Sequence, residues 1–428
     1  MNNRRSIALI NLGCSKNIVD GEYIAAHLEK AGFAVTDDPA AAEIIVVNTC
    51  AFIQEAKEEA IENILQMATF KENGRCEVLV VAGCFSQRYR TEVKNQFPEV
   101  DLWVGTDDWL QKLNEYFETA LSLSFERKLT GLPFSQYLKI SEGCSHRCAF
   151  CAIPSIRGNF RSRPTDQLIA EAQWLESRGI QELILVSQDT TGYGKDRKSS
   201  LVALVEMILQ KTSFPWIRMM YLHPQWVSDE LLRLVGSEKR VCSYFDIPLQ
   251  HISDSVLKAM GRRPGSAEIY KLIERIRCTV SDAGIRSSFI LGFPGESDKD
   301  FRQLLRFIQW ARFDKVGVFP FSPEEGTPAA EMRPRPRTST AMARCEELMD
   351  IQRTISSDIL EQHIGTTLPV IVDDISDNPD FNFEGRTQWD APEVDGRVLI
   401  VDGNVEPGRI VPVKVIDTSD YDMFGRIE

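Results

Sequence analysis

The stretch KISEGCSHRCAFCAIPS, residues 139–155, holds Cys144, Cys148 and Cys151 in a CxxxCxxC spacing. Cysteines this close together are typical of iron–sulfur sites. Three thiolates hold only three irons of a four-iron cubane, so the fourth iron is open to a small molecule. The spacing therefore predicts a 4Fe–4S cluster at which chemistry takes place, with these three cysteines as the catalytic group.

Two other interpretations of the same cysteines compete with the cluster. Zinc also binds closely spaced thiolates, but it usually takes four ligands, and the nearest further candidate is His146 inside the loop. Buried cysteines can also serve as small apolar side chains. Three cysteines packed so tightly favour the cluster over both alternatives.

This motif resembles that of the radical S-adenosylmethionine (SAM) superfamily. The resemblance implies that the amino and carboxylate groups of SAM chelate the open iron, and that one electron then cleaves SAM to a deoxyadenosyl radical. It also implies that Phe150, which precedes the last cysteine, packs near the adenine. The protein would position SAM and keep water and oxygen away from the radical.

Around and beyond the motif, apolar strand candidates alternate with helical stretches, which predicts a parallel sheet. Six strand–helix units are fewer than the eight of a full barrel, so we expect a partial (β/α)6 barrel over residues 137–336. The strand candidates are YLKIS from Tyr137, ELILVSQ from Glu182, WIRMMYL from Trp216, YFDIPLQ from Tyr244, IRSSFILGF from Ile285 and KVGVFPF from Lys315.

Polar residues collect after these strands, where a parallel sheet binds its ligands. Each of them could equally be a helix cap, a loop hydrogen-bonding group or a turn glycine. By resemblance to the superfamily, the end of the second strand would contact the amino or ribose groups of SAM, and the LGFPGE backbone would approach the adenine. The residues concerned are Ser187, Gln188, Asp189, His223, Gln250, His251, Gly292 and Gly295.

Upstream of the motif, three further cysteines each end an apolar run. The runs are IALINLGC to Cys14, EIIVVNTC to Cys50 and VLVVAGC to Cys84, and a helical stretch follows each one. This pattern predicts successive strands of an open parallel α/β sheet over residues 1–120, whose carboxyl edge brings the three thiols together. No GxGxxG or P-loop is present, which argues against a nucleotide-binding domain.

Three buried thiols at strand ends would explain that pattern without any cluster. The series GCSKNIVD, VNTC and VAGC followed by CxxxCxxC, however, resembles the methylthiotransferases. The resemblance implies that Cys14, Cys50 and Cys84 hold a second, auxiliary 4Fe–4S cluster, which is linked to the sulfur that is inserted.

The carboxyl-terminal region changes character again. After a linker at 121–136 and a connecting helix at 337–363, residues 364–428 contain short strand candidates separated by turns, which predicts a small antiparallel β-barrel. This region resembles the TRAM domain that closes the methylthiotransferase chain. The expected fold class is thus a multidomain α/β protein with a small terminal barrel.

Charge limits what the terminal barrel can bind. Residues 364–428 carry fourteen acidic and five basic side chains, so −9 of the chain's net charge of −13 lies there. A nucleic-acid-binding barrel needs a basic face. We therefore expect no direct nucleic-acid binding by this domain and a basic protein as partner.

Three stretches resemble the protein-directed branch of the methylthiotransferases: GCSKNIVD, ISEGCSHRCAFCAIPSIRG and GRTQWDAPEVDG from Gly385 to Gly396. That branch modifies the β-carbon of an aspartate in small-subunit ribosomal protein twelve, free or in the subunit, and needs an electron donor protein. The alternatives are the branch that methylthiolates adenosine in tRNA and a non-catalytic iron–sulfur electron carrier or redox sensor.

Localisation is expected to be cytoplasmic. Arg4 and Arg5 resemble the start of a twin-arginine signal, but the apolar run behind them is short, contains Asn11 and has no cleavage pattern. No segment approaches the roughly 20 apolar residues of a membrane span. Free thiols and clusters suit a reducing compartment.

Overall fold

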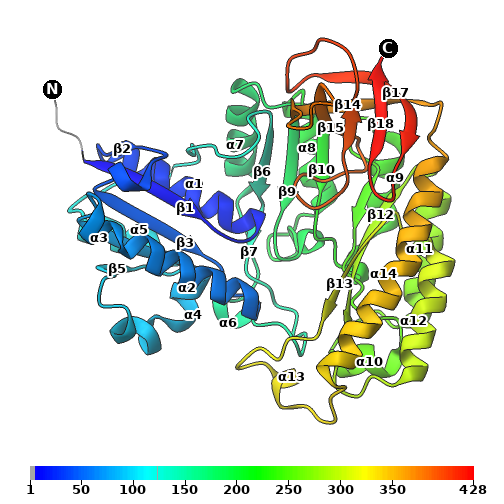
Figure 1. The fold of residues 1–428 in the computed structure, drawn as a ribbon, viewed down its shortest axis with the longest axis horizontal. Helices are drawn as coiled ribbons and strands as arrows, with labels where there is room; N and C mark the ends of the chain where they lie inside the picture. Colours follow the sequence, from blue (N-terminus) through cyan, green and yellow to red (C-terminus); the bar gives the residue numbers. More distant parts are fainter. Residues whose placement is uncertain (1–4, 123) are drawn as a thin grey trace.

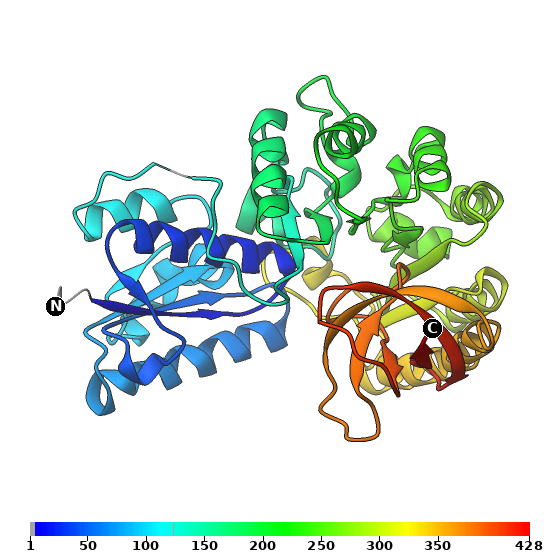
Figure 2. The ribbon, with the colours of Figure 1, turned by 90° about the horizontal axis from the view of Figure 1, so that it is seen from above.

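The computed structural model describes residues 5–122 and 124–428, so Arg4 lies outside the described residues. Three compact parts follow one another along the chain (Figure 1). Seen from above, the amino-terminal sheet lies on one side of an arc of strands and helices, and the terminal barrel lies against the other end of that arc (Figure 2).

The amino-terminal part is the predicted open parallel sheet, with strand order β2-β1-β3-β4-β5. Helices α1 and α5 bury one face of the sheet, while α2 and α4 bury the other. Because both faces are covered, β3 and β4 are buried along their whole length. The strands are β1 (Ser6–Asn11), β2 (Ala34–Val35), β3 (Ile44–Thr49), β4 (Val78–Gly83) and β5 (Leu102–Trp103), and the helices are α1 (Ser15–Lys30), α2 (Gln54–Ala68), α4 (Cys84–Val93) and α5 (Trp109–Tyr116).

The middle part confirms the partial barrel. Its six strands form two parallel three-stranded sheets, ordered β10-β9-β6 and β11-β12-β13. A parallel bridge between Ile217 and Val241 links the two sheets into one arc. The strands are β6 (Ser135–Lys139), β9 (Glu182–Val186), β10 (Trp216–Met219), β11 (Tyr244–Asp246), β12 (Gly284–Leu291) and β13 (Lys315–Pro320).

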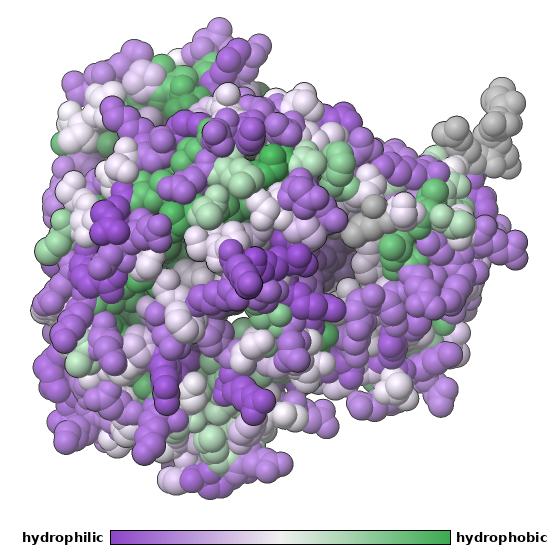
Figure 3. All heavy atoms as spheres, turned by 180° about the vertical axis from the view of Figure 1, so that it is seen from behind, coloured by the Kyte–Doolittle hydropathy of each residue, from purple (hydrophilic) through white to green (hydrophobic). Residues whose placement is uncertain are grey.

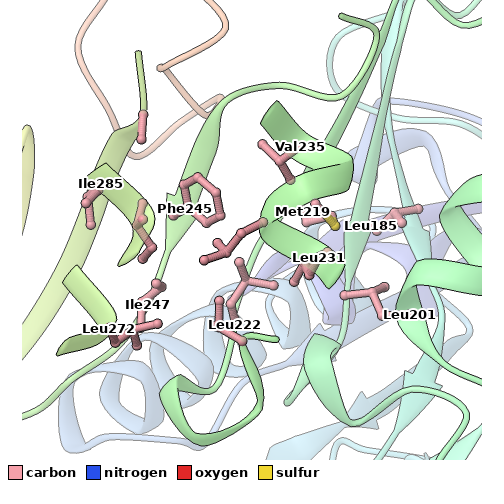
Figure 4. Packing of buried hydrophobic residues seen from close by; sticks show 14 of the residues in the cluster. Leu185, Leu201, Met219, Leu222, Leu231, Val235, Phe245, Ile247, Leu272 and Ile285 are labelled. Carbon is pink, nitrogen blue, oxygen red and sulfur yellow. The ribbon is translucent and has the colours of Figure 1, made fainter. Parts of the chain in front are cut away.

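The main hydrophobic core lies between this arc and the helices outside it. Leu185 and Met219 on the strands pack toward Leu201, Leu231 and other helical side chains in one continuous cluster (Figure 4). The principal covering helices are α7 (Thr165–Ser177), α8 (Leu201–Lys211), α9 (Asp229–Ser237), α11 (Ser266–Thr279) and α12 (Asp298–Ala311). The long helix α14 (Thr338–Glu361) packs beside β13 and leads into the terminal barrel.

The terminal part is a closed five-stranded barrel with strand order β14-β15-β16-β18-β17. All neighbouring strands are antiparallel except β16 and β18, which pair in parallel. The prediction of an antiparallel barrel therefore holds for every pair but this one. The strands are β14 (Thr367–Ile375), β15 (Phe383–Arg386), β16 (Val398–Ile400), β17 (Ile410–Thr418) and β18 (Met423–Ile427).

A buried ion network docks the terminal barrel on the amino ends of the middle strands. Glu182, the first residue of β9, pairs with Arg218 of β10 at 2.7 Å and with Arg386 of β15 at 2.9 Å. Arg386 also pairs with Asp373 of β14 at 2.6 Å. Burial alone would raise the pKa of the Glu182 carboxyl, but Arg386 and Arg218 outweigh that effect and lower the pKa to about 2.

Within the described residues, no helix combines the length and the apolar character that crossing a membrane would require. The rear face of the molecule is mostly hydrophilic and carries only limited apolar patches (Figure 3).

Replacing Glu182 with Gln should destabilise the docked barrel, because two buried arginines lose the carboxylate that they share. Breaking a buried ion pair costs about 3–5 kcal/mol. We expect the urea midpoint of Glu182→Gln at pH 7 to lie well below that of the wild type, with Glu206→Gln, an exposed site on α8, as the matched control. Equal midpoints for the two variants would contradict this account of docking.

The Glu182 carboxyl also determines the direction in which stability changes with pH. The folded-state pKa of Glu182 lies below the ordinary value of 4.5. Its stabilising contribution is therefore complete above pH 4.5 and is lost as the pH falls toward about 2. Unfolding midpoints measured across that range should converge for the wild type and Glu182→Gln at the acidic end.

Candidate functional site

All six cysteines singled out in the sequence line one cavity of about 430 Å³ between the amino-terminal sheet and the partial barrel. Each of them is a free thiol. The carboxyl ends of β1 and β3 point toward the middle part of the chain (Figure 1), which accounts for the meeting of the two sets. The six are Cys14, Cys50, Cys84, Cys144, Cys148 and Cys151.

Buried asparagines tie together the strand ends that carry the first set. Asn17 Nδ2 donates to the carbonyl oxygen of Leu12 at 2.7 Å and to that of Thr49 at 3.3 Å. Asn48 Nδ2 donates in turn to Asn17 O at 2.7 Å. These bonds join the segment after β1 to the end of β3, next to Cys14 and Cys50.

Gly13 permits the closest approach of these two segments. Its φ is +88°, and an added Cβ would lie 2.6 Å from Cys50 Cβ. An L-residue at this position would be strained and would also collide with Cys50. Glycine is therefore required immediately before Cys14.

The CxxxCxxC loop is held by backbone hydrogen bonds to neighbouring segments. The N–H of Cys144 donates to Gly158 O at 3.1 Å, and the N–H of Ala149 donates to Met260 O at 2.8 Å. Gly143 has a φ of +71°, and its missing Cβ would lie 2.4 Å from Asn159 O. The loop thus closes tightly on the segment that follows it.

A buried four-residue ion network fixes one cysteine set relative to the other. Asp20 of α1 pairs with Arg157 at 2.8 Å and also with Lys139, the last residue of β6. Glu142 completes the network, 2.7 Å from Lys139 and 3.1 Å from Arg157. Because Asp20 belongs to the amino-terminal part and the other three to the middle part, the network locks the two parts together.

Arg157 also contacts a cysteine directly, since its Nε donates to Cys84 Sγ at 3.3 Å. Burial would raise the pKa of Cys14, but Lys16 and Arg157 outweigh burial and lower it. Burial raises the pKa of Cys84 to about 12 despite Arg157. Burial likewise raises the pKa of Cys151 to about 12. Metal binding would expel the protons that these thiols carry at pH 7.

Within residues 5–122 and 124–428, no three His, Cys, Asp or Glu side chains are grouped closely enough to hold a single metal ion. His146, the extra ligand weighed for zinc, instead has its Nε2 2.7 Å from Asp189 Oδ2. A cubane is a larger body that needs thiolates around it and space between them. Two sets of three free thiols on one cavity fit two such clusters.

The other predicted site residues divide between the cavity and its surroundings. Phe150 and Gln188 line the cavity. Phe150 packs edge-to-face on Phe293, with ring centroids 6.5 Å apart. Gln188 Nε2 donates to Glu142 at 3.3 Å, while its Oε1 is buried without a partner among the described residues.

Asp189, Gly292 and Gly295 do not line the cavity. The Asp189 carboxylate lies behind His146 and accepts from Thr191 Oγ1 at 2.6 Å. Gly292 lies against Ala341 of α14, which an added Cβ would approach to 2.5 Å. Their predicted contacts with SAM stay predictions. Of the other polar residues after the strands, His223 and Gln250 line the cavity.

Lys16, Tyr221 and Arg262 are among the cavity residues that were missed in the sequence. Lys16 Nζ lies 3.3 Å from the centroid of the Tyr221 ring. Arg262 Nη1 lies 3.7 Å from Cys148 Sγ. The position of Lys16 two residues after a candidate ligand was the one available signal, because nothing local marks the other two.

Comparison with protein families gives three matches. Residues 6–105 match a family described as uncharacterized protein family UPF0004, residues 138–308 match the radical SAM superfamily, and residues 364–427 match the TRAM domain. The last two confirm resemblances found in the sequence.

Curated relatives align with the whole chain. The protein named ribosomal protein uS12 methylthiotransferase RimO from Geotalea uraniireducens is 42% identical to this chain, over 99% of this chain and 98% of the relative. The protein of that name in Geobacter sulfurreducens is 41% identical over 100% and 99%. The protein of the same name in Acetivibrio thermocellus is 40% identical over 99% of this chain and 98% of the relative.

Solved structures share the fold at low sequence identity. The radical SAM methyltransferase TsrM from Kitasatospora setae, with cobalamin and a 4Fe-4S cluster bound, has a TM-score of 0.53 at 13% identity, covering 88% of this chain and 82% of its own. The cobalamin-dependent SAM radical enzyme OxsB, with aqua-cobalamin and SAM bound, has a TM-score of 0.52 at 13% identity. The match covers 82% of this chain and 58% of OxsB.

Gly143→Ala should disrupt the cysteine loop, because its methyl group would collide with backbone carbonyls that cannot move aside. Gly131→Ala is the matched control, since Gly131 has a φ of +73° with nothing within 4 Å of an added Cβ. Both variants carry the ~1–2 kcal/mol cost of a left-handed L-residue. We expect amide hydrogen exchange at residues 144–151 to accelerate only in Gly143→Ala. Similar exchange in both variants would show that the close approach does not hold the loop.

Proposed function

The chain belongs to the family of the ribosomal protein uS12 methylthiotransferases, and from this premise we propose that it is a radical SAM transferase that inserts a methylthio group into uS12, small-subunit protein twelve, at the β-carbon of one aspartate. The observation that carries the proposal is the single cavity lined by two sets of three free cysteines. A protein that only carried electrons would usually hold each 4Fe–4S cluster with four cysteines, whereas each set here supplies three.

We assign one 4Fe–4S cluster to each set. Cys144, Cys148 and Cys151 would hold the SAM-binding cluster, and Cys14, Cys50 and Cys84 the auxiliary cluster. When bound, the first cluster supplies an open iron for SAM and the electron for its cleavage, and the auxiliary cluster supplies a site for the sulfur to be transferred. The β-carbon hydrogen of an aspartate is not acidic, which is why radical rather than acid–base chemistry suits this substrate.

The surrounding residues bind, orient and exclude water. Phe150 offers an apolar edge to an adenine, and Gln188 offers a polar side chain at the cavity wall that would contact SAM. Asp189 would act through His146, which it orients. The buried ion network around Arg157 keeps both thiol sets facing the same space.

The acidic terminal barrel supports a basic protein partner. Three of its carboxylates point inward: Asp373 pairs with Arg386 inside the barrel, while Asp390 and Asp395 pair with Lys315 and Arg286 of the middle part. Most of the remaining acidic side chains are exposed: Asp374, Asp377, Asp380, Glu393, Asp402, Glu406, Asp417, Asp420 and Glu428. Such a surface attracts a basic ribosomal protein and repels a phosphate backbone. We place the reaction in the reducing cytoplasm, with an electron donor protein.

The decisive experiment is peptide mass spectrometry of uS12 after anaerobic incubation with the reconstituted enzyme, SAM and a reductant. A methylthio group on one aspartate is the expected product. tRNA nucleosides analysed in parallel test the other branch. A methylthio group on adenosine, with none on uS12, would overturn the protein-directed proposal.

Cysteine variants should separate the two sets. Cys148→Ala is expected to abolish SAM cleavage, measured as deoxyadenosine, because its set loses a ligand. Cys50→Ala should retain cleavage but form no methylthio product. Cys278→Ala, an exposed thiol outside the cavity, is the control and should behave as wild type. Equal loss of cleavage in the first two variants would contradict the assignment of SAM cleavage to one cysteine set and of sulfur transfer to the other.

A further inference from the structure

Lys16 is a buried cation at the cavity that forms no ion pair within the described parts of the chain. Its relative exposure is 7%, it lines the cavity, and the face of the Tyr221 ring lies 3.3 Å from Nζ. Buried lysines are almost always paired. The aromatic face offers a cation–π contact, which is weaker than a carboxylate partner.

No aspartate or glutamate of the described residues lines the cavity, and three carboxylates that contact its lining residues are already engaged. Asp20 and Glu142 each pair with both Lys139 and Arg157. Asp189 pairs with His146. No carboxylate of this group is left to neutralise Lys16.

The position of Lys16 in its helix adds to the cost. Lys16 is the second residue of α1 (Ser15–Lys30), in the first turn. The amino end of a helix carries partial positive charge and disfavours a cation. A cation that is buried, lacks a carboxylate and lies at the wrong helix end breaks local rules in the way functional residues do.

We propose that the Lys16 ammonium binds the carboxylate of the substrate aspartate, a role that rests on the proposed function. The carboxylate carbon is bonded directly to the β-carbon, so a fixed carboxylate leaves that carbon little freedom. Tyr221 packs on the ammonium and restricts where it can lie. Lys16 follows Cys14 by two residues, so the anchored β-carbon lies on the side of the cavity from which sulfur is delivered.

The other cavity cations suit this role less well. Arg157 already contacts two carboxylates and Cys84. Arg262 lies at the opposite thiol set, where Nη1 contacts Cys148 Sγ at 3.7 Å and Nη2 donates to Pro248 O. Lys16 is thus the cation that has no carboxylate partner among the described residues and lies beside the auxiliary cysteines.

The test compares two substrates in each enzyme. One is uS12 with its natural aspartate, and the other carries asparagine at the modified position, which keeps the β-carbon hydrogens but removes the charge. Wild type should strongly prefer aspartate in kcat/KM. Lys16→Gln should lower kcat/KM for the aspartate substrate about 10- to 100-fold, as expected for a lost contact to a charged group. It should also reduce the preference for aspartate over asparagine at least tenfold.

Iron content and the electron paramagnetic resonance spectra of the reduced clusters are measured alongside. Lys16→Arg keeps the charge and should keep the preference for aspartate, which makes it the deciding variant if Lys16→Gln loses iron. An unchanged preference in iron-replete Lys16→Gln, or a preference lost in iron-replete Lys16→Arg, would overturn the proposal. If wild type forms no methylthio product on uS12, the proposed function itself has failed.

Discussion

The site depends on the contacts that the Arg157 guanidinium makes. It reaches Asp20, Asn17 and Cys84 in the amino-terminal part and Glu142 beside the cysteine loop. Breaking a buried pair by removing one partner costs several kcal/mol, so other placements of the two parts are disfavoured. The network thus holds the two parts in the arrangement in which thiols from both sides line a single cavity.

Sequence reasoning reached the cysteines because their positions follow from topology. Strands that end in GC or TC within one parallel sheet must bring those thiols to one edge, whatever the details of the loops. Lys16 and Tyr221 could not be found in this way, because their contact joins residues 205 positions apart in two different parts of the chain. Gly292 was placed at a ligand by its position after a strand, whereas its backbone packs on a helix that comes later in the sequence.

The acidic side chains of the terminal barrel have more than one role. The acidic count predicted a partner surface, yet Asp390 and Asp395 serve to dock the barrel on Lys315 and Arg286. A charge count cannot separate inward from outward carboxylates, since that division depends on which loops and strand faces the middle part covers. The exposed remainder is still acidic, which is why the expectation of a basic partner survives as a proposal.

The spacing of Asp20 and Arg157, 137 positions apart, has a consequence for the growing chain on the ribosome. At about 5–20 residues per second, the chain between them takes roughly 7–27 s to synthesise. Cys14, Cys50 and Cys84 are all synthesised before Arg157, so for part of this time they lack the wall that later covers them. These thiols are thus most exposed to oxidants during synthesis, before the middle part of the chain has folded over them.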